Sequence, residues 1–205
     1  MLTDVESKSE GSPSGEITLW LRSWQEGNDQ ALDHVMNLVM DTLHAMAQRL
    51  FLKESARHTL QPTALVNEVY LRLLREKRLQ ADNRVQFLGM IARKMRQILV
   101  DYARKKRFRS PQGNPNLTVS LESVGERPCL EEASVDVLAL NEALLRLGRK
   151  APRMAQIVEM RFFAGLTITE TSLVLALSER TVYRDWLVAK SRLFQDLAPG
   201  RQGHE

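Results

Sequence analysis

The sequence predicts an all-α protein made of two small helical domains joined by a flexible linker. Apolar residues recur at three- and four-residue steps over most of the chain, which is the period of a helix. No alternation of apolar and polar residues is sustained enough to predict a strand. Between residues 109 and 134 the chain is rich in Pro, Gly and Glu, which indicates a linker between the two helical halves.

The first half, residues 16–108, reads as a helical hairpin followed by two more helices. A polar interruption separates the first two helical patterns, and Asn28 or Asp29 is placed to cap the second one. Pro62 suits the first turn of the next helix, because its fixed φ is already helical. The last helical pattern starts at Phe87 and ends in a dense basic run.

The second half, residues 135–198, is again helical and contains a predicted helix-turn-helix. Gly165 is placed as a left-handed C-cap, and Thr167 with Glu170 fits a capping box at the start of the next helix. A three-residue turn that ends at Ser178 then leads into a second helix, which Ser178 can cap. The second helix of such a pair can enter a DNA major groove.

The helix after Ser178 has an apolar face and a polar face. Val182, Trp186 and Ala189 share the face that is expected to pack inside. The polar side chains of the turn and helix are candidates for contacts with base edges and phosphates. These candidates are Ser178, Arg180, Thr181, Tyr183, Arg184 and Lys190. Amphipathic helices commonly carry a solvated charged face, so this segment by itself also fits a purely structural role.

Positive charge is concentrated at the end of the first half. From Arg93 to Arg109 eight cations accompany one acid, Asp101, so the segment has a net charge of 8 − 1 = +7 against +4 for the whole chain. Apolar residues keep helical spacing inside the segment, so the charge lies on the exposed side of an anchored helix. This stripe suits a phosphate backbone, and Tyr102 and Phe108 within it can stack on unpaired bases. A solvated helix end is the structural alternative.

Composition limits the class of protein and its location. With 43% hydrophobic and 26% charged residues, the chain has the composition of a globular protein. The single cysteine, Cys129, cannot form an intramolecular disulfide, which favours the reducing cytoplasm. No apolar run approaches the roughly 20 residues that cross a bilayer, so no direct membrane insertion is expected. Residues 1–15 and 199–205 are predicted to be tails, the first of them disordered.

The sequence shows no motif for catalysis, metal binding or cofactor binding. Its four histidines are scattered, and no HExxH, Gly-rich phosphate loop or nucleophile elbow accompanies them. We therefore predict a protein that is not an enzyme and that requires neither metal nor cofactor. One alternative stays open at this point, a dimeric helix-turn-helix regulator that binds palindromic duplex DNA without RNA polymerase.

Both halves resemble extracytoplasmic-function (ECF) sigma factors of the sigma-70 family. Their region 2 is matched by LQPTALVNEVYLRL at 60–73, by Phe87-Leu88 and by ARKMRQILVDYAR at 92–104. Their region 4 is matched by VEMRFFAGLT at 158–167 and TVYRDW at 181–186. The resemblance spans about residues 17–197, with the segments in the family's order. It implies a sigma factor that binds core RNA polymerase and directs promoter recognition, promoter melting and transcription initiation.

The resemblance also implies roles for individual residues. The helix from Ala64 to Leu74 resembles the one that docks on the polymerase, with Asn67, Glu68 and Arg72 as its contacts. The loop at 78–86 resembles the one that captures a base flipped from the non-template strand. The following helix resembles the segment that melts and reads the minus-10 element. Its contact residues are then Arg93, Lys94, Arg96, Gln97, Arg104, Lys105 and Lys106. The helix after Ser178 corresponds to the reader of the minus-35 duplex.

The chain departs from the family pattern at three positions. Ala176 stands in the turn where relatives often carry Gly, and Ser172 stands where Ala is common. Both are small, so the turn is expected to form. Lys94 replaces an Asn of many members near the melted strand, so a relative's promoter preference does not transfer. The implied partners are core RNA polymerase and promoter DNA, and the resemblance leaves an anti-sigma factor open as a third.

Overall fold

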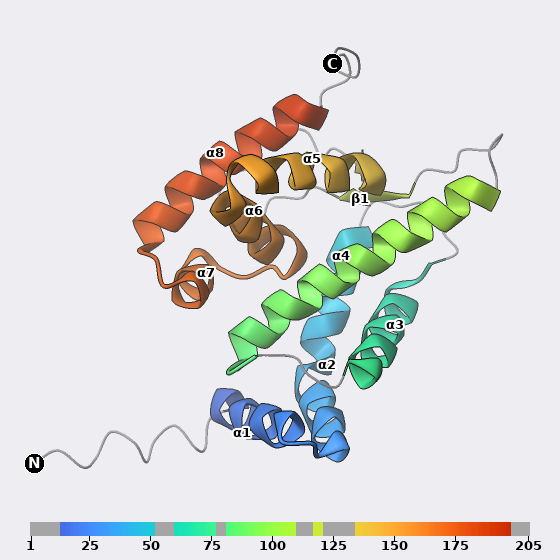
Figure 1. Ribbon diagram of the computed structural model, residues 1–205, viewed down its shortest axis with the longest axis vertical. Helices are drawn as coiled ribbons and strands as arrows, with labels where there is room; N and C mark the ends of the chain where they lie inside the picture. The colour runs from blue at the N-terminus through green and yellow to red at the C-terminus, as the bar shows by residue number, and fades with distance from the viewer. Residues whose placement is uncertain (1–12, 52–59, 77–80, 110–116, 121–133, 198–205) are drawn as a thin grey trace, which may run out of the picture.

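The computed structural model describes residues 13–51, 60–76, 81–109, 117–120 and 134–197. Within these ranges the chain is helical apart from one small sheet, so the predicted all-α class is confirmed (Figure 1). The first half contains α1 (Pro13–Gln25), α2 (Asp29–Phe51), α3 (Pro62–Arg75) and α4 (Arg84–Arg109). The second half contains α5 (Val137–Lys150), α6 (Pro152–Val158), the π-helical turn η1 (Glu159–Phe163), α7 (Ile168–Leu175) and α8 (Glu179–Leu197). The sheet consists of β1 (Thr118–Ser120) and β2 (Ser134–Asp136).

Helices α1 and α2 form the predicted hairpin. The backbone N–H of Gln30 donates to Asn28 Oδ1 over 3.2 Å, so Asn28 caps α2. Pro62 lies in the first turn of α3, as predicted. The N-terminal tail predicted for residues 1–15 overlaps α1, which begins at Pro13. Proline is well suited to a first helical turn, where its missing N–H would have no partner in the helix.

The two-stranded sheet is a difference from the sequence prediction. Strands β1 and β2 pair antiparallel with Val119 opposite Val135, and the N–H of Val137 donates to the carbonyl of Leu117 over 2.8 Å. Leu117 and Val119 are buried, and β1 lies against α2. Three-residue strands are too short to show a period-2 pattern. Within the predicted linker, 109–134, residues 118–120 thus form a strand that pairs with the strand starting at Ser134. Cys129 of this linker lies outside the described residues.

One hydrophobic core runs through both halves of the chain, and helix α4 is central to it. α4 packs on α1 and α3 from the first half and on α5, η1 and α7 from the second (Figure 1). Its buried side includes Phe87, Ile91, Met95 and Leu99, at helical spacing. In this structure the two halves therefore lie in contact. Their division into two domains at 16–108 and 135–198 stays a prediction.

The predicted helix-turn-helix forms through local caps. The hydroxyl of Thr167 accepts the N–H of Glu170 at 3.0 Å, and a Glu170 carboxylate oxygen accepts the N–H of Thr167 at 2.8 Å. This is the predicted capping box of α7. Ser178 caps α8, because its Oγ accepts the N–H of Thr181 at 3.2 Å.

Two residues around this motif have left-handed backbone. Gly165 has φ = 68°, as predicted for a C-cap glycine. Ala176 has φ = 51° in the turn between α7 and α8, so the turn does form without the family's glycine. The Cβ of Ala176 makes this conformation unfavourable by about 1 kcal/mol, a cost that glycine would not carry. The turn is therefore slightly strained.

We predict that Ala176→Gly stabilises the protein by about 0.5–1 kcal/mol, because it removes the left-handed strain at an exposed position. Urea unfolding followed by circular dichroism measures the change. Ala45→Gly serves as the matched control, because Ala45 is exposed in the interior of α2, where glycine is expected to destabilise by about 1 kcal/mol. Destabilisation by both substitutions would contradict the prediction.

Candidate nucleic-acid interface

Helix α4 carries its cations on the sides that its core residues leave exposed. Arg93, Gln97 and Arg104 are four and seven residues apart and therefore lie along one side of the helix. Lys94 and Lys105 lie along a neighbouring side. At the helix end, Arg104 and Lys105 are exposed to solvent. The predicted minus-10 residues thus form two groups along α4, at 93–97 and 104–106, with no cation between them. We call both groups together the α4 cationic face.

Two members of the α4 cationic face contact the second half of the chain. Arg96 Nη2 lies 2.6 Å from Glu159 Oε1, and Arg93 Nε lies 3.3 Å from Glu159 Oε2. Arg96 Nη1 also donates to Asn141 Oδ1 over 2.8 Å. Glu159 begins η1 and Asn141 lies in α5. Neither partner was predicted from the sequence, because both are far from α4 along the chain.

Other contacts hold Lys94 and the start of α4. Lys94 forms an ion pair with Glu76, just after α3, and its side chain is mostly buried. The N–H of Gln86 donates to Asn83 Oδ1 over 3.0 Å, which caps α4 at the described end of the predicted base-capturing loop. Arg84 Nη2 donates to Thr42 Oγ1 over 3.1 Å and ties this end to α2. Residues 78–80 of the loop lie outside the described residues.

The three predicted polymerase contacts lie on α3. Asn67 is exposed, and Arg72 donates to Asp101 of α4 over 2.8 Å and to Glu68 over 3.4 Å. Partial burial lowers the pKa of Arg72, but its hydrogen bonds and attraction to Asp101 and Glu68 outweigh that effect, so the pKa lies above its ordinary value. Arg72 therefore joins α3 to α4 as well as facing solvent.

Two exposed leucines on α3 were not among the contacts expected from the sequence. Leu71 and Leu74 are each 45% exposed and follow Asn67 at i+4 and i+7. They therefore share one stripe with Asn67. The sequence could not identify Leu74 as exposed, because it fits the same helical apolar pattern as the buried leucines of α3. We call residues Asn67, Leu71 and Leu74 the α3 stripe.

Helix α8 has the polarity that the sequence predicted. Val182 and Ala189 are buried, and Trp186 packs against the core. None of the predicted minus-35 residues is buried. Ser178, Arg180, Tyr183 and Arg184 are exposed, whereas Thr181 and Lys190 are half-buried. The Ser178 and Thr181 hydroxyls are 2.8 Å apart and hydrogen-bonded, so the start of α8 has a defined polar surface.

A buried carboxylate, that of Asp185, lies behind the exposed face of α8. Asp185 is 1% exposed, and its Oδ2 accepts from Arg153 Nε of α6 over 2.8 Å. Its Oδ1 accepts from Arg184 Nε and Nη2 over 3.3 and 3.2 Å. Ionised groups with such partners form strong hydrogen bonds. Asp185 therefore orients Arg184, one of the predicted base or phosphate contacts, and fastens α8 to α6. The sequence pattern gave no sign that this acid points inward.

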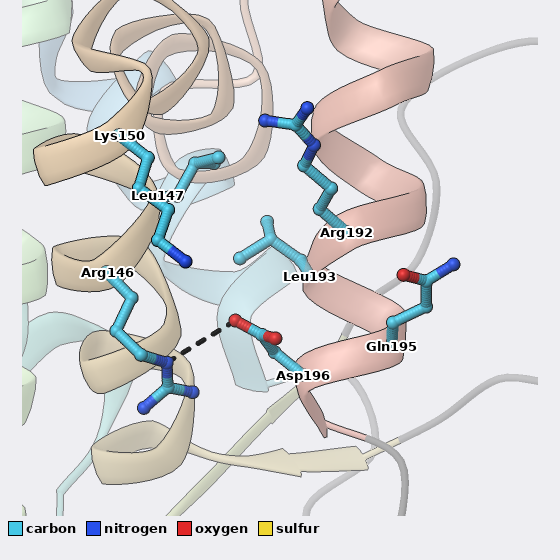
Figure 2. Close-up of a pocket in the computed structure, with 7 residues that line it drawn as sticks. All are labelled: Arg146, Leu147, Lys150, Arg192, Leu193, Gln195 and Asp196. Atoms are coloured by element: carbon cyan, nitrogen blue, oxygen red, sulfur yellow. Dashed lines mark hydrogen bonds and ion pairs between the residues drawn. The ribbon is translucent and has the colours of Figure 1, made fainter. Parts of the chain in front are cut away.

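A cationic groove lies between α5 and α8, outside the predicted sites (Figure 2). It has a volume of about 490 Å³, with Leu147 and Leu193 in its wall. Arg146 pairs with Asp196 across it at 3.4 Å, while Arg192 extends toward its other end (Figure 2). None of the predicted contact residues lines this groove.

Among the described residues, no group of three or more His, Cys, Asp or Glu side chains is arranged to hold a metal ion. In the described part of the chain, no helix combines the length and the apolar character that crossing a membrane requires. Arg104 and Lys105 of α4 and Arg180 and Arg184 of α8 are exposed cations, and such groups can bind nucleic acid.

A mainly helical chain with an exposed helix-turn-helix and a separate cationic helix has the architecture of a DNA-binding transcription factor. The family model described as ECF sigma factor matches residues 14–199, and the chain belongs to the ECF sigma factor family. It is accordingly a sigma factor with a role in transcription initiation. No match was found among curated proteins.

We predict that Asp185→Ala lowers the free energy of unfolding by about 2 kcal/mol, because it removes charged hydrogen bonds from a buried site. Asp196→Ala is the matched control. Asp196 is also an acid of α8 that pairs with an arginine from another helix, but the pair is exposed and should contribute less than about 1 kcal/mol. Both values follow from urea unfolding curves, and equal losses would refute the structural role of Asp185.

Proposed function

We propose that the chain binds core RNA polymerase in the cytoplasm and directs it to promoters by contacting DNA at two places. The α4 cationic face would bind the melted minus-10 element, and the exposed face of α8 would read the minus-35 element as duplex. The polymerase supplies the catalytic chemistry, so the chain itself acts as a specificity subunit. The observation that carries this proposal is the presence of both surfaces in a member of the ECF sigma factor family.

The chemistry of the two surfaces supports different tasks. Arg104 and Lys105 are exposed, and Phe108 beside them is 87% exposed. Cations with an exposed aromatic ring suit a single strand, because they pair with phosphates while the ring stacks on a base. Helix α8 instead offers Arg180 and Arg184 on a rigid, capped helix, which suits base edges in a major groove. The α3 stripe offers an apolar surface to a protein partner.

The direct test is a pull-down of purified chain with core polymerase, followed by run-off transcription on a genomic library. We expect the chain to bind core and to direct initiation at a defined promoter set. Specific binding of the isolated chain to palindromic duplex, together with no affinity for core, would instead establish the polymerase-independent regulator.

We predict that Leu71→Glu with Leu74→Glu weakens core binding at least about tenfold, because charge on the α3 stripe would be desolvated in the complex. Affinity for labelled core is measured by fluorescence anisotropy. Leu19→Glu is the matched control on α1, where Leu19 is 54% exposed, and it should leave core affinity unchanged. All three leucines are exposed, so folding should survive. Equal effects of the control and the double variant would remove the α3 stripe from the interface.

We predict that the two DNA surfaces respond differently to substitution. Neutralising Arg104, Lys105 and Lys106 to Gln should weaken holoenzyme binding to all promoters. It should also reduce the slope of log K against log salt by about 0.7 for each phosphate of the melted strand that the variant no longer neutralises. Arg184→Ala should act through the minus-35 sequence, with a decrease in binding free energy of about 1–3 kcal/mol that disappears on promoters mutated there.

Salt-dependent binding assays on promoters with and without the minus-35 element measure both effects. Arg22→Gln, on the exposed side of α1, controls for the loss of one positive charge, as in Arg184→Ala. The same sequence-independent weakening from both sets of substitutions would contradict the assigned division between α4 and α8.

A further inference from the structure

We propose that, in the free chain, the α4 cationic face is the docking surface for the chain's own second half, so that this half and single-stranded promoter DNA compete for it. The inference rests on the proposed function, because it takes Arg93 and Arg96 as DNA contacts. In the structure Glu159 lies against both arginines, at 3.3 and 2.6 Å. Its carboxylate provides anionic oxygens of the kind that a DNA phosphate would present.

The contact between Arg96 and Glu159 is enclosed. Their side chains are only 16% and 14% exposed, and Asn141 takes a further N–H of Arg96. A guanidinium whose donors are bonded to a carboxylate and an amide cannot bind a phosphate with the same atoms. DNA can therefore reach Arg96 only after α5 and η1 move away from α4.

Further contacts join the same two halves. The Cε of Met160, in η1, lies 3.8 Å from the position of a Cβ on Gly89 of α4, so the side chain of Met160 packs over that glycine. Arg49 of α2 reaches over Gly165, where a Cβ would lie 1.9 Å from its Nη1. A groove of about 390 Å³ continues the interface, with Glu142 of α5 lining it together with Arg104 and Arg107. Acidic and amide groups of the second half thus face α4 at Arg93 and Arg96 and, in this groove, at Arg104 and Arg107.

The interface has features of a contact that opens. Arg49 Nε and Arg96 Nε are buried there and have no hydrogen-bond partner in the described part of the chain. Burial also lowers the pKa of Arg49. Unpartnered buried donors make an interface less stable than its area suggests, because each has given up its water. Glu159 also starts a π-helical turn, a rare distortion that is frequent at functional sites.

The test uses the full chain with Glu159→Arg, which places a cation against Arg93 and Arg96 and should separate the halves. Spin labels at Leu19→Cys and Leu187→Cys, in a Cys129→Ser background, report the distance between α1 and α8. We expect a narrow distance distribution for the parent chain and a broad one for Glu159→Arg. Adding Arg96→Glu to Glu159→Arg should restore the narrow distribution, which an unfolded variant could not do.

The second measurement is binding of fluorescein-labelled oligothymidylate by the free chain. Glu159→Arg should bind it about tenfold more tightly, as expected if the open form is about one tenth populated in the parent. Glu26→Arg makes the same charge change in the exposed turn between α1 and α2 and should alter affinity by less than about twofold.

A broad distribution for the parent chain, a narrow one for Glu159→Arg, or equal affinity gains from Glu159→Arg and Glu26→Arg would each overturn the inference. Failure of the parent chain to bind core polymerase would overturn the proposed function instead. The distance distribution and the oligothymidylate affinity of the free chain would then still decide whether its two halves are in contact.

Discussion

Helix α4 has to satisfy two opposing demands, and the rest of the structure depends on how it does so. One side supplies buried apolar residues to a core that α1, α3, α5, η1 and α7 all share. The other sides carry the densest positive charge in the chain. Helical periodicity allows one helix to meet both demands, because core residues at three- and four-residue steps leave the intervening positions for charged side chains. Charge of one sign on a single helix is self-repelling, so every acid that faces it matters.

Those acids come from separate parts of the chain and have separate consequences. Glu76 and Asp101 belong to the first half and hold Lys94 and Arg72 where α3 meets α4. Glu159 belongs to the second half and forms ion pairs with both Arg93 and Arg96. The first set of pairs does not depend on contact between the two halves, whereas the second set does. Ion pairs of α4 therefore stabilise the first half by itself at α3, and they join the first half to the second at Glu159.

The helix-turn-helix depends both on local capping residues and on one buried charged residue. The caps at Thr167 and Ser178 begin both helices and depend only on neighbouring residues. Asp185 does something that no local rule supplies, since it joins Arg153 and Arg184 from beneath the exposed surface. An acid in an amphipathic pattern is ordinarily expected to be exposed, and here the partner on α6 reverses that expectation.

The sequence by itself determined the helices, their caps, the helix-turn-helix, the family resemblance and the concentration of charge on α4, because each depends on residues close together along the chain. Only the tertiary structure decided that Leu117 and Val119 are buried at strand β1, that Leu71 is exposed, and that Glu159 lies against Arg96. These outcomes depend on contacts between residues far apart in the chain. Periodicity says which side of a helix is apolar, but burial and ion pairing are set by whichever distant element comes to lie against it.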